Sequence, residues 1–289
     1  MLFLIIAIVT RIFVNPISNV FQKQLTKFQH PLFVNLVTYV ILSFGSLFLL
    51  KDFPYKTIPQ NFWVYSLLGG ICGALGNGFI IKALEQGQLS VLGPINAYKS
   101  IVGIIFAYFL IGELPNYWGW LGIALIIIGS YFVLGNEEGK FSWSIFTQKA
   151  IQYRIAALIL TGIQAVLDKK VIQHSNLIYA FAGWSIFGLL FSFPLYVFTK
   201  QSFKSQFSNM TKGMLLKYLG LALSVGIMVA ATNYTFKNMQ VGTALALFQV
   251  SILISVLFGK HFFKELGIIK KLIGASIMIS GSLLILLLK

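Results

Sequence analysis

The chain has 289 residues, of which 57% are hydrophobic and only 10% are charged, and its mean hydropathy is +0.85. Because a soluble domain is about a quarter charged, this composition excludes a soluble globular protein. The formal net charge of +15 does not indicate nucleic-acid binding, since the basic residues are scattered through short polar segments without clustered aromatic residues. The single cysteine, Cys72, excludes an intrachain disulfide and a cysteine-based metal site.

Apolar segments recur along nearly the whole chain, separated by short polar breaks that often contain Gly or Pro. About 20 apolar residues allow a helix to cross a bilayer, and these runs are too long and leucine-rich for the strands of a membrane barrel. We therefore predict an all-α membrane protein with ten transmembrane helices, which in chain order cover residues 2–21, 31–50, 61–84, 89–111, 117–135, 151–173, 176–199, 213–237, 241–263 and 266–288.

The two halves of the chain are similar in sequence. One gap-free shift aligns a glutamate and two spaced glycines of the first half with those of the second: Glu113 with Glu265, Gly122 with Gly274 and Gly129 with Gly281. This similarity predicts two five-helix repeats, residues 1–136 and 137–289. Because five is an odd number, the second repeat must be inserted upside down. Inverted repeats usually place a substrate site at their interface, near the bilayer midplane.

The polar segments differ in charge between the two sides of the predicted bundle. Most Lys and Arg residues, including Lys23, Lys27, Lys270 and Lys271, fall on one side. By the positive-inside rule this side is cytoplasmic, and both chain ends then lie outside the cytoplasm. We expect a multi-pass protein of the inner (cell) membrane.

Two basic residues lie deep within predicted helices. Arg11 falls in the middle of the first helix and Lys99 in the middle of the fourth. A charge near the bilayer midplane costs several kcal/mol even on lenient insertion scales, and no acidic residue is expected at comparable depth. Two unpaired cations indicate a pathway for an anionic or strongly polar solute. The alternative for Lys99 is a structural ion pair with a carboxylate at a helix end, such as Glu85 or Asp168.

A family resemblance is carried by the run Gln88-Leu89-Ser90-Val91-Leu92-Gly93-Pro94, by Gly112-Glu113-Leu114, and by the glycines at 122 and 129. This pattern resembles the EamA-type members of the drug/metabolite transporter superfamily, and the second half resembles them through Gln240, Glu265, Gly274 and Gly281. The resemblance implies secondary transport by alternating access, with a central cavity lined by helices one to four and six to nine and with helices five and ten at the periphery. Two features depart from the family: Ala246 stands at the counterpart of Pro94, and the family is usually described with both termini in the cytoplasm.

The candidate substrate-binding residues are polar, charged or aromatic residues within the helices that the resemblance places around the cavity: Lys99, Arg11, Asn15, Asn96, Asn77, Gln164, Trp184, Phe248, Gln249 and Ser251. Lys and Arg can hold a carboxylate or phosphate, and Asn and Gln supply donors and acceptors for an amino or hydroxyl group. The aromatic residues can line an apolar pocket or face a cation. The alternative for the amides is hydrogen bonding between helices, and for the aromatic residues it is packing.

Four further residues are expected near helix ends. Glu113 and Glu265 occupy matched junctions, and Lys23 and Lys169 are matched residues that border the predicted cavity mouth. We expect structural or gate roles, in which the carboxylates satisfy exposed helix ends or pair with lysines.

No pattern supports catalysis, because the sequence has no glycine-rich phosphate loop, His-rich metal spacing or nucleophile elbow. We expect no catalytic residue, metal site or cofactor. The prediction is a transporter of small polar metabolites in the lipid bilayer, exporting an amino-acid-like or organic-anion substrate, without a nucleic-acid partner, as a monomer or weak dimer. Exchange or facilitated diffusion is favoured over proton coupling. Two alternatives stay open: an importer of a small cation such as choline, and a membrane enzyme or scaffold without a solute pathway.

Overall fold

The computed structural model describes residues 1–50, 53, 57–99, 101–102, 116–134, 143–208 and 210–288. Within these ranges every regular element is a helix. The α-helices are α1 Leu2–Leu25, α2 Pro31–Leu47, α3 Gln60–Gln86, α4 Leu89–Leu92, α6 Tyr117–Leu134, α7 Lys149–Gln173, α8 Leu177–Val197, α9 Phe203–Ser208, α10 Lys212–Asn238, α11 Val241–Phe248, α12 Ser251–Phe263 and α13 Ile268–Leu287. Three 3-10 turns, η1 Phe48–Leu50, η2 Pro94–Ala97 and η3 Trp143–Thr147, complete the described elements.

Several helices begin where side chains satisfy their first backbone donors. His30 Nδ1 accepts a hydrogen bond from Leu32 N at 3.2 Å, and Pro31 occupies the first turn of α2, where its missing donor costs nothing. The side chain of Asn176 caps α8 in the same way, and that of Thr211 caps α10. The polar breaks of the sequence therefore set the helix starts directly.

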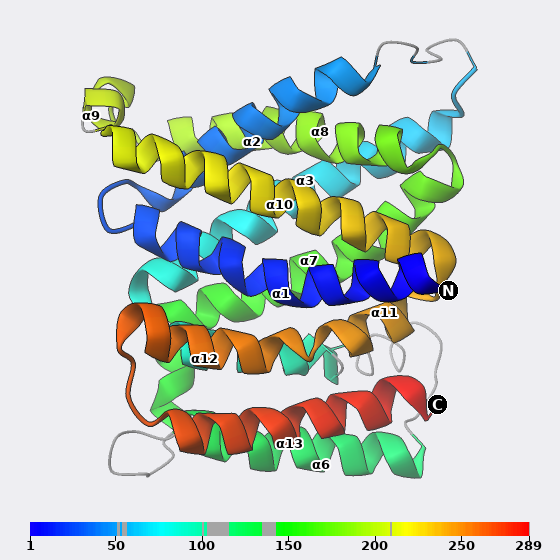
Figure 1. Cartoon of the computed structure of the whole chain (residues 1–289), viewed down its shortest axis with the longest axis vertical. Helices are drawn as coiled ribbons and strands as arrows, with labels where there is room; N and C mark the ends of the chain where they lie inside the picture. Colours follow the sequence, from blue (N-terminus) through cyan, green and yellow to red (C-terminus); the bar gives the residue numbers. More distant parts are fainter. Residues whose placement is uncertain are drawn as a thin grey trace.

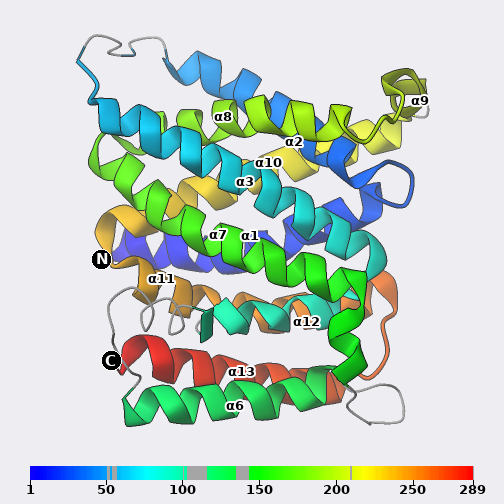
Figure 2. The same cartoon turned by 180° about the vertical axis from the view of Figure 1, so that it is seen from behind.

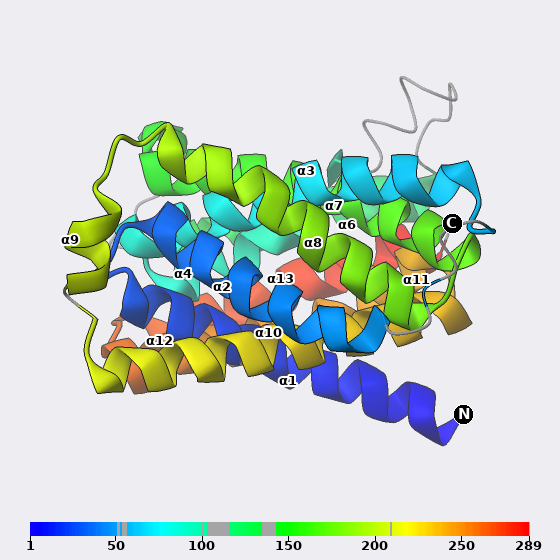
Figure 3. The same ribbon diagram turned by 90° about the horizontal axis from the view of Figure 1, so that it is seen from above.

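The long helices lie side by side in one bundle, with both chain ends at one end of it and α9 at the other (Figure 1). Helices α1 and α10 cover one face, and α3 and α7 cover the opposite face (Figures 2 and 3). Eight helices of the described part are long and apolar enough to cross a membrane. The prediction of an all-helical, multi-pass membrane protein is thus confirmed, and many large apolar side chains face outward, as lipid contact requires.

Two predicted helices differ from the structure because each is broken. The expected helix 89–111 consists of α4, Gly93 and η2 in its described part, and much of it lies outside the described residues. The expected helix 241–263 is divided into α11 and α12, with Gln249 and Val250 between them. Pro94 lacks a backbone donor and explains the first break. No proline or glycine stands at the second break, so packing must determine it.

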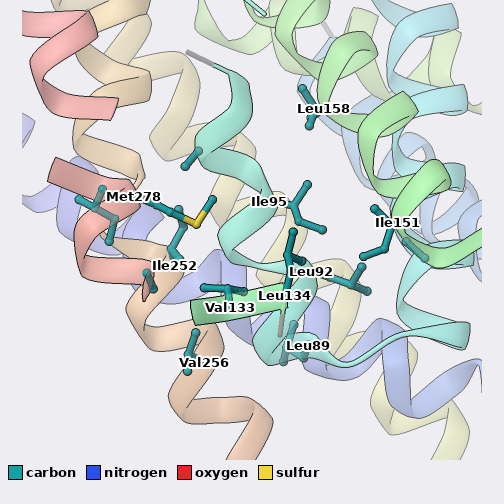
Figure 4. Close-up of a cluster of buried hydrophobic side chains, with 14 of the residues drawn as sticks. Leu89, Leu92, Ile95, Val133, Leu134, Ile151, Leu158, Ile252, Val256 and Met278 are labelled. Carbon is teal, nitrogen blue, oxygen red and sulfur yellow. The ribbon is translucent and has the colours of Figure 1, made fainter. Parts of the chain in front are cut away.

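The α4–η2 segment is held by a large cluster of buried apolar side chains (Figure 4). Leu89, Leu92 and Ile95 of the segment pack in one cluster with side chains of α6, α7, α12 and α13, among them Val133, Leu134, Ile151, Leu158, Ile252, Val256 and Met278. A short broken segment forms few of its own hydrogen bonds, so this packing keeps it in place. The cluster thereby positions η2 and the two residues that follow it.

Helices α6 and α13 pack against each other at the edge of the bundle through four glycines (Figure 1). A Cβ atom added to Gly122 would lie 2.5 Å from the carbonyl oxygen of Gly281, and one added to Gly274 would lie 2.5 Å from that of Gly129. The backbones of the two helices are therefore in direct contact. Small residues that permit such contact are typical of helix pairs in membranes.

We predict that Gly274→Ala destabilises the protein by about 1–3 kcal/mol, because the new methyl group overlaps a backbone atom that has no freedom to rotate away. The measurement is thermal unfolding of the detergent-purified protein. Gly162→Ala in α7 is the matched control, because nothing lies within 4 Å of its added Cβ. Equal melting temperatures for both variants would contradict the close contact.

Candidate functional site

A cavity of about 150 Å³ lies inside the bundle, between the α1–α10 face and the α3–α7 face. Its wall is unusually polar for the interior of a membrane protein: Arg11, Asn15, Asn19, Tyr39, Asn77, Asn96, Lys99, Arg154, Thr161, Gln164, Asp168, Trp184, Thr232 and Asn233 line it. Apolar residues and one glycine complete the wall: Gly73, Ile80, Ala165, Val225, Met228, Val229, Phe236, Leu245 and Phe248.

The structure brings all but two of the predicted substrate-binding residues to this cavity: Arg11, Asn15, Asn77, Asn96, Lys99, Gln164, Trp184 and Phe248. Gln249 and Ser251 are buried but do not line it. Gln249 donates a weak hydrogen bond to the carbonyl oxygen of Asn96 at 3.5 Å, and Ser251 donates to that of Phe248 at 2.7 Å. The break between α11 and α12 accounts for their placement, because these side chains satisfy backbone groups beside it.

Two charged residues that line the cavity were not among the candidates. Arg154 is buried in α7, and its Nε donates to the carbonyl oxygen of Leu92 at 2.9 Å. Asp168 corrects the expectation that no acidic residue lies at depth, because its carboxylate faces the cavity and accepts from Gln164 Nε2 at 3.0 Å. For Asp168 the available signal was its spacing from the candidate Gln164 on one predicted helix, since residues four apart share a helix face.

The cationic groups of the cavity are incompletely paired. Arg11 Nε donates to Thr232 Oγ1 at 2.9 Å, and the guanidinium lies 5.0 Å from the ring centre of Phe248. Its Nη1 is buried without a hydrogen-bond partner. Lys99 makes no hydrogen bond or ion pair within the described part of the chain, so the structural pairing with Glu85 or Asp168 is absent there. Arg154 and Arg11 are close enough to repel its ammonium group.

Asn77 is held at the cavity wall by a chain of hydrogen bonds between helices. Its Nδ2 donates to Asn35 Oδ1 at 2.7 Å, and its Oδ1 accepts from Gln22 Nε2 at 3.2 Å. Asn35 in turn donates to Ala74 O and Ser192 Oγ. These bonds connect α1, α2, α3 and α8, so Asn77 also has the interhelical role that polar residues often take in membranes.

The end of the bundle that carries α9 is rich in lysine, and we call it the lysine-rich end: Lys23, Lys27, Lys82, Lys149, Lys200, Lys204, Lys212, Lys217, Lys260, Lys264, Lys270 and Lys271. An ion pair joins the two halves of the chain here. Lys23 Nζ lies 2.9 Å from Glu265 Oε1 and donates to the carbonyl oxygen of Gly87 at 2.7 Å. The Glu265 carboxylate also accepts from the backbone N–H groups of Leu89 and Ser90, each at 2.8 Å.

Lys169, in the second half of the chain, makes a contact that corresponds to the contact of Lys23 with Gly87 in the first half. Its Nζ donates to the carbonyl oxygens of Phe236 and Met239 where α10 ends, as Lys23 does to Gly87 where α3 ends. Both lysines satisfy carbonyls that a helix terminus leaves free. Glu113, the predicted counterpart of Glu265, lies outside the described residues.

The surroundings of Glu265 shift its pKa below the ordinary value of 4.5. Burial alone would raise this pKa, but the hydrogen bonds from Ser90 and the charge of Lys23 favour the carboxylate and outweigh burial. A carboxyl group with a lowered folded-state pKa stabilises the fold fully above its unfolded pKa. That contribution is lost as the pH falls through the folded-state value.

We predict that Glu265→Gln lowers the stability at pH 7 by about 1–3 kcal/mol, because Lys23 and two backbone donors lose a charged acceptor. The melting temperatures of the natural protein and this variant should begin to converge as the pH falls below about 4.5, and they should meet only below the lowered folded-state pKa, where the natural carboxylate becomes protonated. Glu85→Gln, at the exposed end of α3, serves as the control. A difference that does not shrink at any pH below 4.5 would contradict the role of the ion pair.

Comparison with known proteins identifies relatives along nearly the whole chain. Residues 2–135 and 148–287 match the model of the EamA-like transporter family. A solved structure, described only as a crystal structure of a protein, shares the fold with a TM-score of 0.65 and 15% sequence identity, covering 99% of this chain and 96% of that one.

Two curated relatives match part of the chain. The probable magnesium transporter NIPA9 of Arabidopsis thaliana is 22% identical over 215 residues, which is 68% of this chain and 58% of the relative. UDP-galactose transporter homolog 1 of Saccharomyces cerevisiae is 28% identical over 82 residues, or 28% of this chain and 24% of the relative. The chain thus spans less than two thirds of the length of these curated relatives.

Proposed function

Because the chain belongs to the EamA-like transporter family, we propose that it is a secondary transporter that moves small metabolites carrying an anionic group across a membrane. The observation that supports this substrate class is the charge of the cavity. Arg11, Lys99 and Arg154 line it together, and Asp168 is the one carboxylate among its described lining residues. The excess positive charge of this cavity favours an anionic guest.

Lys99 and Arg11 are the groups we assign to the anionic end of the substrate. Charges within a membrane are costly and mark substrate pathways when they line a cavity. Lys99 has no partner in the described part of the chain, and Arg11 keeps a free donor at Nη1. A guanidinium can bind a carboxylate or phosphate through two hydrogen bonds, and an ammonium adds a point charge. A bound anion would complete the hydrogen bonding of both.

The transport mechanism we propose is alternating access by two inverted five-helix repeats, residues 1–136 and 137–289, with ten membrane-crossing helices. Two observations support the repeat. The contact of Gly122 with Gly281 is matched by that of Gly274 with Gly129, and the lysine contacts at the ends of α3 and α10 correspond. Inverted repeats usually place the substrate beside broken helices, and the cavity is lined by Asn96 of η2 and by Leu245 and Phe248 of α11.

We assign the Lys23–Glu265 ion pair to the gate at the lysine-rich end. It connects α1 and the start of α4 with the segment between α12 and α13. Opening the cavity at this end requires these contacts to separate. We further propose that this end faces the cytoplasm, in accordance with the positive-inside rule, and that an amino-acid-like or organic-anion substrate is exported from the cell, the direction that the family resemblance favours.

A cation transporter is the second candidate, favoured by Asp168 and by the aromatic rings of Tyr39 and Trp184 at the cavity. The probable magnesium transporter among the relatives also belongs to this class. Arg11, Lys99 and Arg154 oppose it by repulsion, and the described residues contain no group of three or more His, Cys, Asp or Glu suited to a metal ion.

We predict that Lys99→Ala weakens binding of the anionic substrate about tenfold or more, as expected for loss of one charge-assisted hydrogen bond. The measurement is the ligand-induced rise in melting temperature, with amino acids, organic acids, sugar phosphates, choline and Mg²⁺ as probes, followed by uptake into proteoliposomes. Lys204→Ala on exposed α9 is the matched control. Stabilisation by choline or Mg²⁺ that survives Lys99→Ala would favour the cation transporter.

The proposed orientation predicts which end an impermeant thiol reagent reaches in intact cells. In a Cys72→Ser background, Lys237→Cys should be labelled, because Lys237 is exposed at the end that carries the chain termini. Lys204→Cys at the lysine-rich end should be labelled only after the membrane is opened. The reverse pattern would overturn the orientation without affecting the substrate assignment.

A further inference from the structure

Three polar atoms from three helices converge beside Gly73 on α3. A Cβ atom added to Gly73 would lie 3.1 Å from Tyr39 Oη of α2, 3.1 Å from Trp184 Nε1 of α8 and 3.4 Å from Gln164 Oε1 of α7. All three side chains and Gly73 itself line the cavity. The absent side chain therefore lets these three polar atoms gather against the backbone of α3, in a part of the cavity wall that we call the Gly73 recess.

The Gly73 recess contains polar atoms that the protein does not satisfy. Tyr39 Oη and Trp184 Nε1 are buried without a hydrogen-bond partner, and their residues are only 1% and 8% exposed. Buried polar groups nearly always have partners, and each exception calls for an explanation such as a missing guest. Two such exceptions at one place in a cavity wall indicate a position that a bound molecule completes.

Asp168 adds a negative charge next to this recess. Its Oδ1 would lie 3.5 Å from a Cβ added to Gly69, which precedes Gly73 by about one turn of α3. Its Oδ2 accepts the hydrogen bond from Gln164. The recess therefore offers acceptors at Asp168, Gln164 and Tyr39, which suit an ammonium group, and a donor at Trp184, which suits an oxygen atom.

Two of the three cationic groups of the cavity belong to other parts of the fold, and the third, Arg154, shares α7 with Asp168 but donates to the carbonyl oxygen of Leu92. Arg11 lies on α1 and contacts Thr232 of α10 and Phe248 of α11, whereas Lys99 follows η2. The cavity wall thus combines a cationic part with an acceptor-rich part that contains a carboxylate. A simple anion would leave the second part unused, and a simple cation would leave the first part unpaired.

We propose that the substrate is a zwitterion, whose anionic group binds Arg11 and Lys99 and whose ammonium group binds Asp168, Gln164 and Tyr39 in the Gly73 recess. This inference rests on the proposed transport function and specifies its substrate class. Asp168 and Tyr39 become the residues that distinguish an amino acid from the corresponding hydroxy acid. The specificity arises because a hydroxyl group brings no charge to the Asp168 carboxylate.

The test compares matched pairs of ligands on the full-length, detergent-purified protein. Each pair differs only in an ammonium or hydroxyl group: alanine and lactate, leucine and 2-hydroxyisocaproate, phenylalanine and 3-phenyllactate, and glutamate and 2-hydroxyglutarate. Affinities come from melting-temperature titrations. For at least one pair we expect the amino acid to bind about tenfold more tightly, the effect of one charge-assisted hydrogen bond.

The variants separate the recess from the rest of the site. Asp168→Asn and Tyr39→Phe should each remove most of the preference for the amino acid and leave the affinity for the hydroxy acid nearly unchanged. Tyr39→Phe deletes an oxygen without a partner, so the fold loses no hydrogen bond. Tyr196→Phe is the matched control, because Tyr196 Oη is also unpartnered and buried but does not line the cavity.

The outcomes distinguish this inference from the proposed function. If both members of every pair bind equally and neither Asp168→Asn nor Tyr39→Phe changes the affinities, the zwitterion inference is wrong, while anion binding that depends on Lys99 still supports the proposed function. If no anionic compound binds and only choline or Mg²⁺ stabilises the protein, the proposed function itself fails.

Discussion

The cost of holding charged and polar groups away from water is the constraint on which this structure depends. A bilayer supplies no hydrogen-bond partners, so each polar group in the bundle must find one inside the protein. Several do so across helices, as Asn77 does with Asn35 and Gln22 and as Glu265 does with Lys23 and the start of α4. Of the six buried side-chain groups without a partner in the described part of the chain, three belong to Arg11, Tyr39 and Trp184, which line one cavity. This placement supports the proposal that the cavity binds the substrate.

Much of this arrangement could be predicted from the sequence, because bilayer thickness sets helix length and composition marks each helix. The sequence pattern also brought Arg11 and Lys99 to one predicted cavity and matched Gly122 with Gly274, although it did not predict that these glycines are in close contact. The interruption at Pro94 has a local cause, although a continuous helix was expected. The break at Gln249 and Val250 has no such local signal. It turns Gln249 and Ser251 toward backbone groups, so their exclusion from the cavity wall required the tertiary structure.

Asp168 and Arg154 show that the position of a residue along a predicted helix does not determine whether its side chain reaches the interior of the bundle. Both lie toward the ends of the predicted helix 151–173 and were expected near an interface. The packing of α7 against α3 turns Asp168 toward Gly69, and the bond from Arg154 to Leu92 connects α7 with the broken segment. The charge balance of the cavity follows from these two contacts. Neither contact could be inferred from hydropathy, because a hydropathy profile contains no information about how one helix packs against another.

The glycine contacts between α6 and α13 have a mechanical consequence. Where helices meet through side chains, changes of rotamer can absorb a shift between them, but here backbone meets backbone at Gly122 with Gly281 and at Gly129 with Gly274. At these four positions a change of rotamer cannot absorb a shift between the helices, because no side chain stands between the two backbones there. We therefore expect α6 and α13 to move together as one rigid unit. Conformational change must then occur elsewhere in the molecule. The broken segments beside the cavity, α4–η2 and α11–α12, are the places where the backbone can bend.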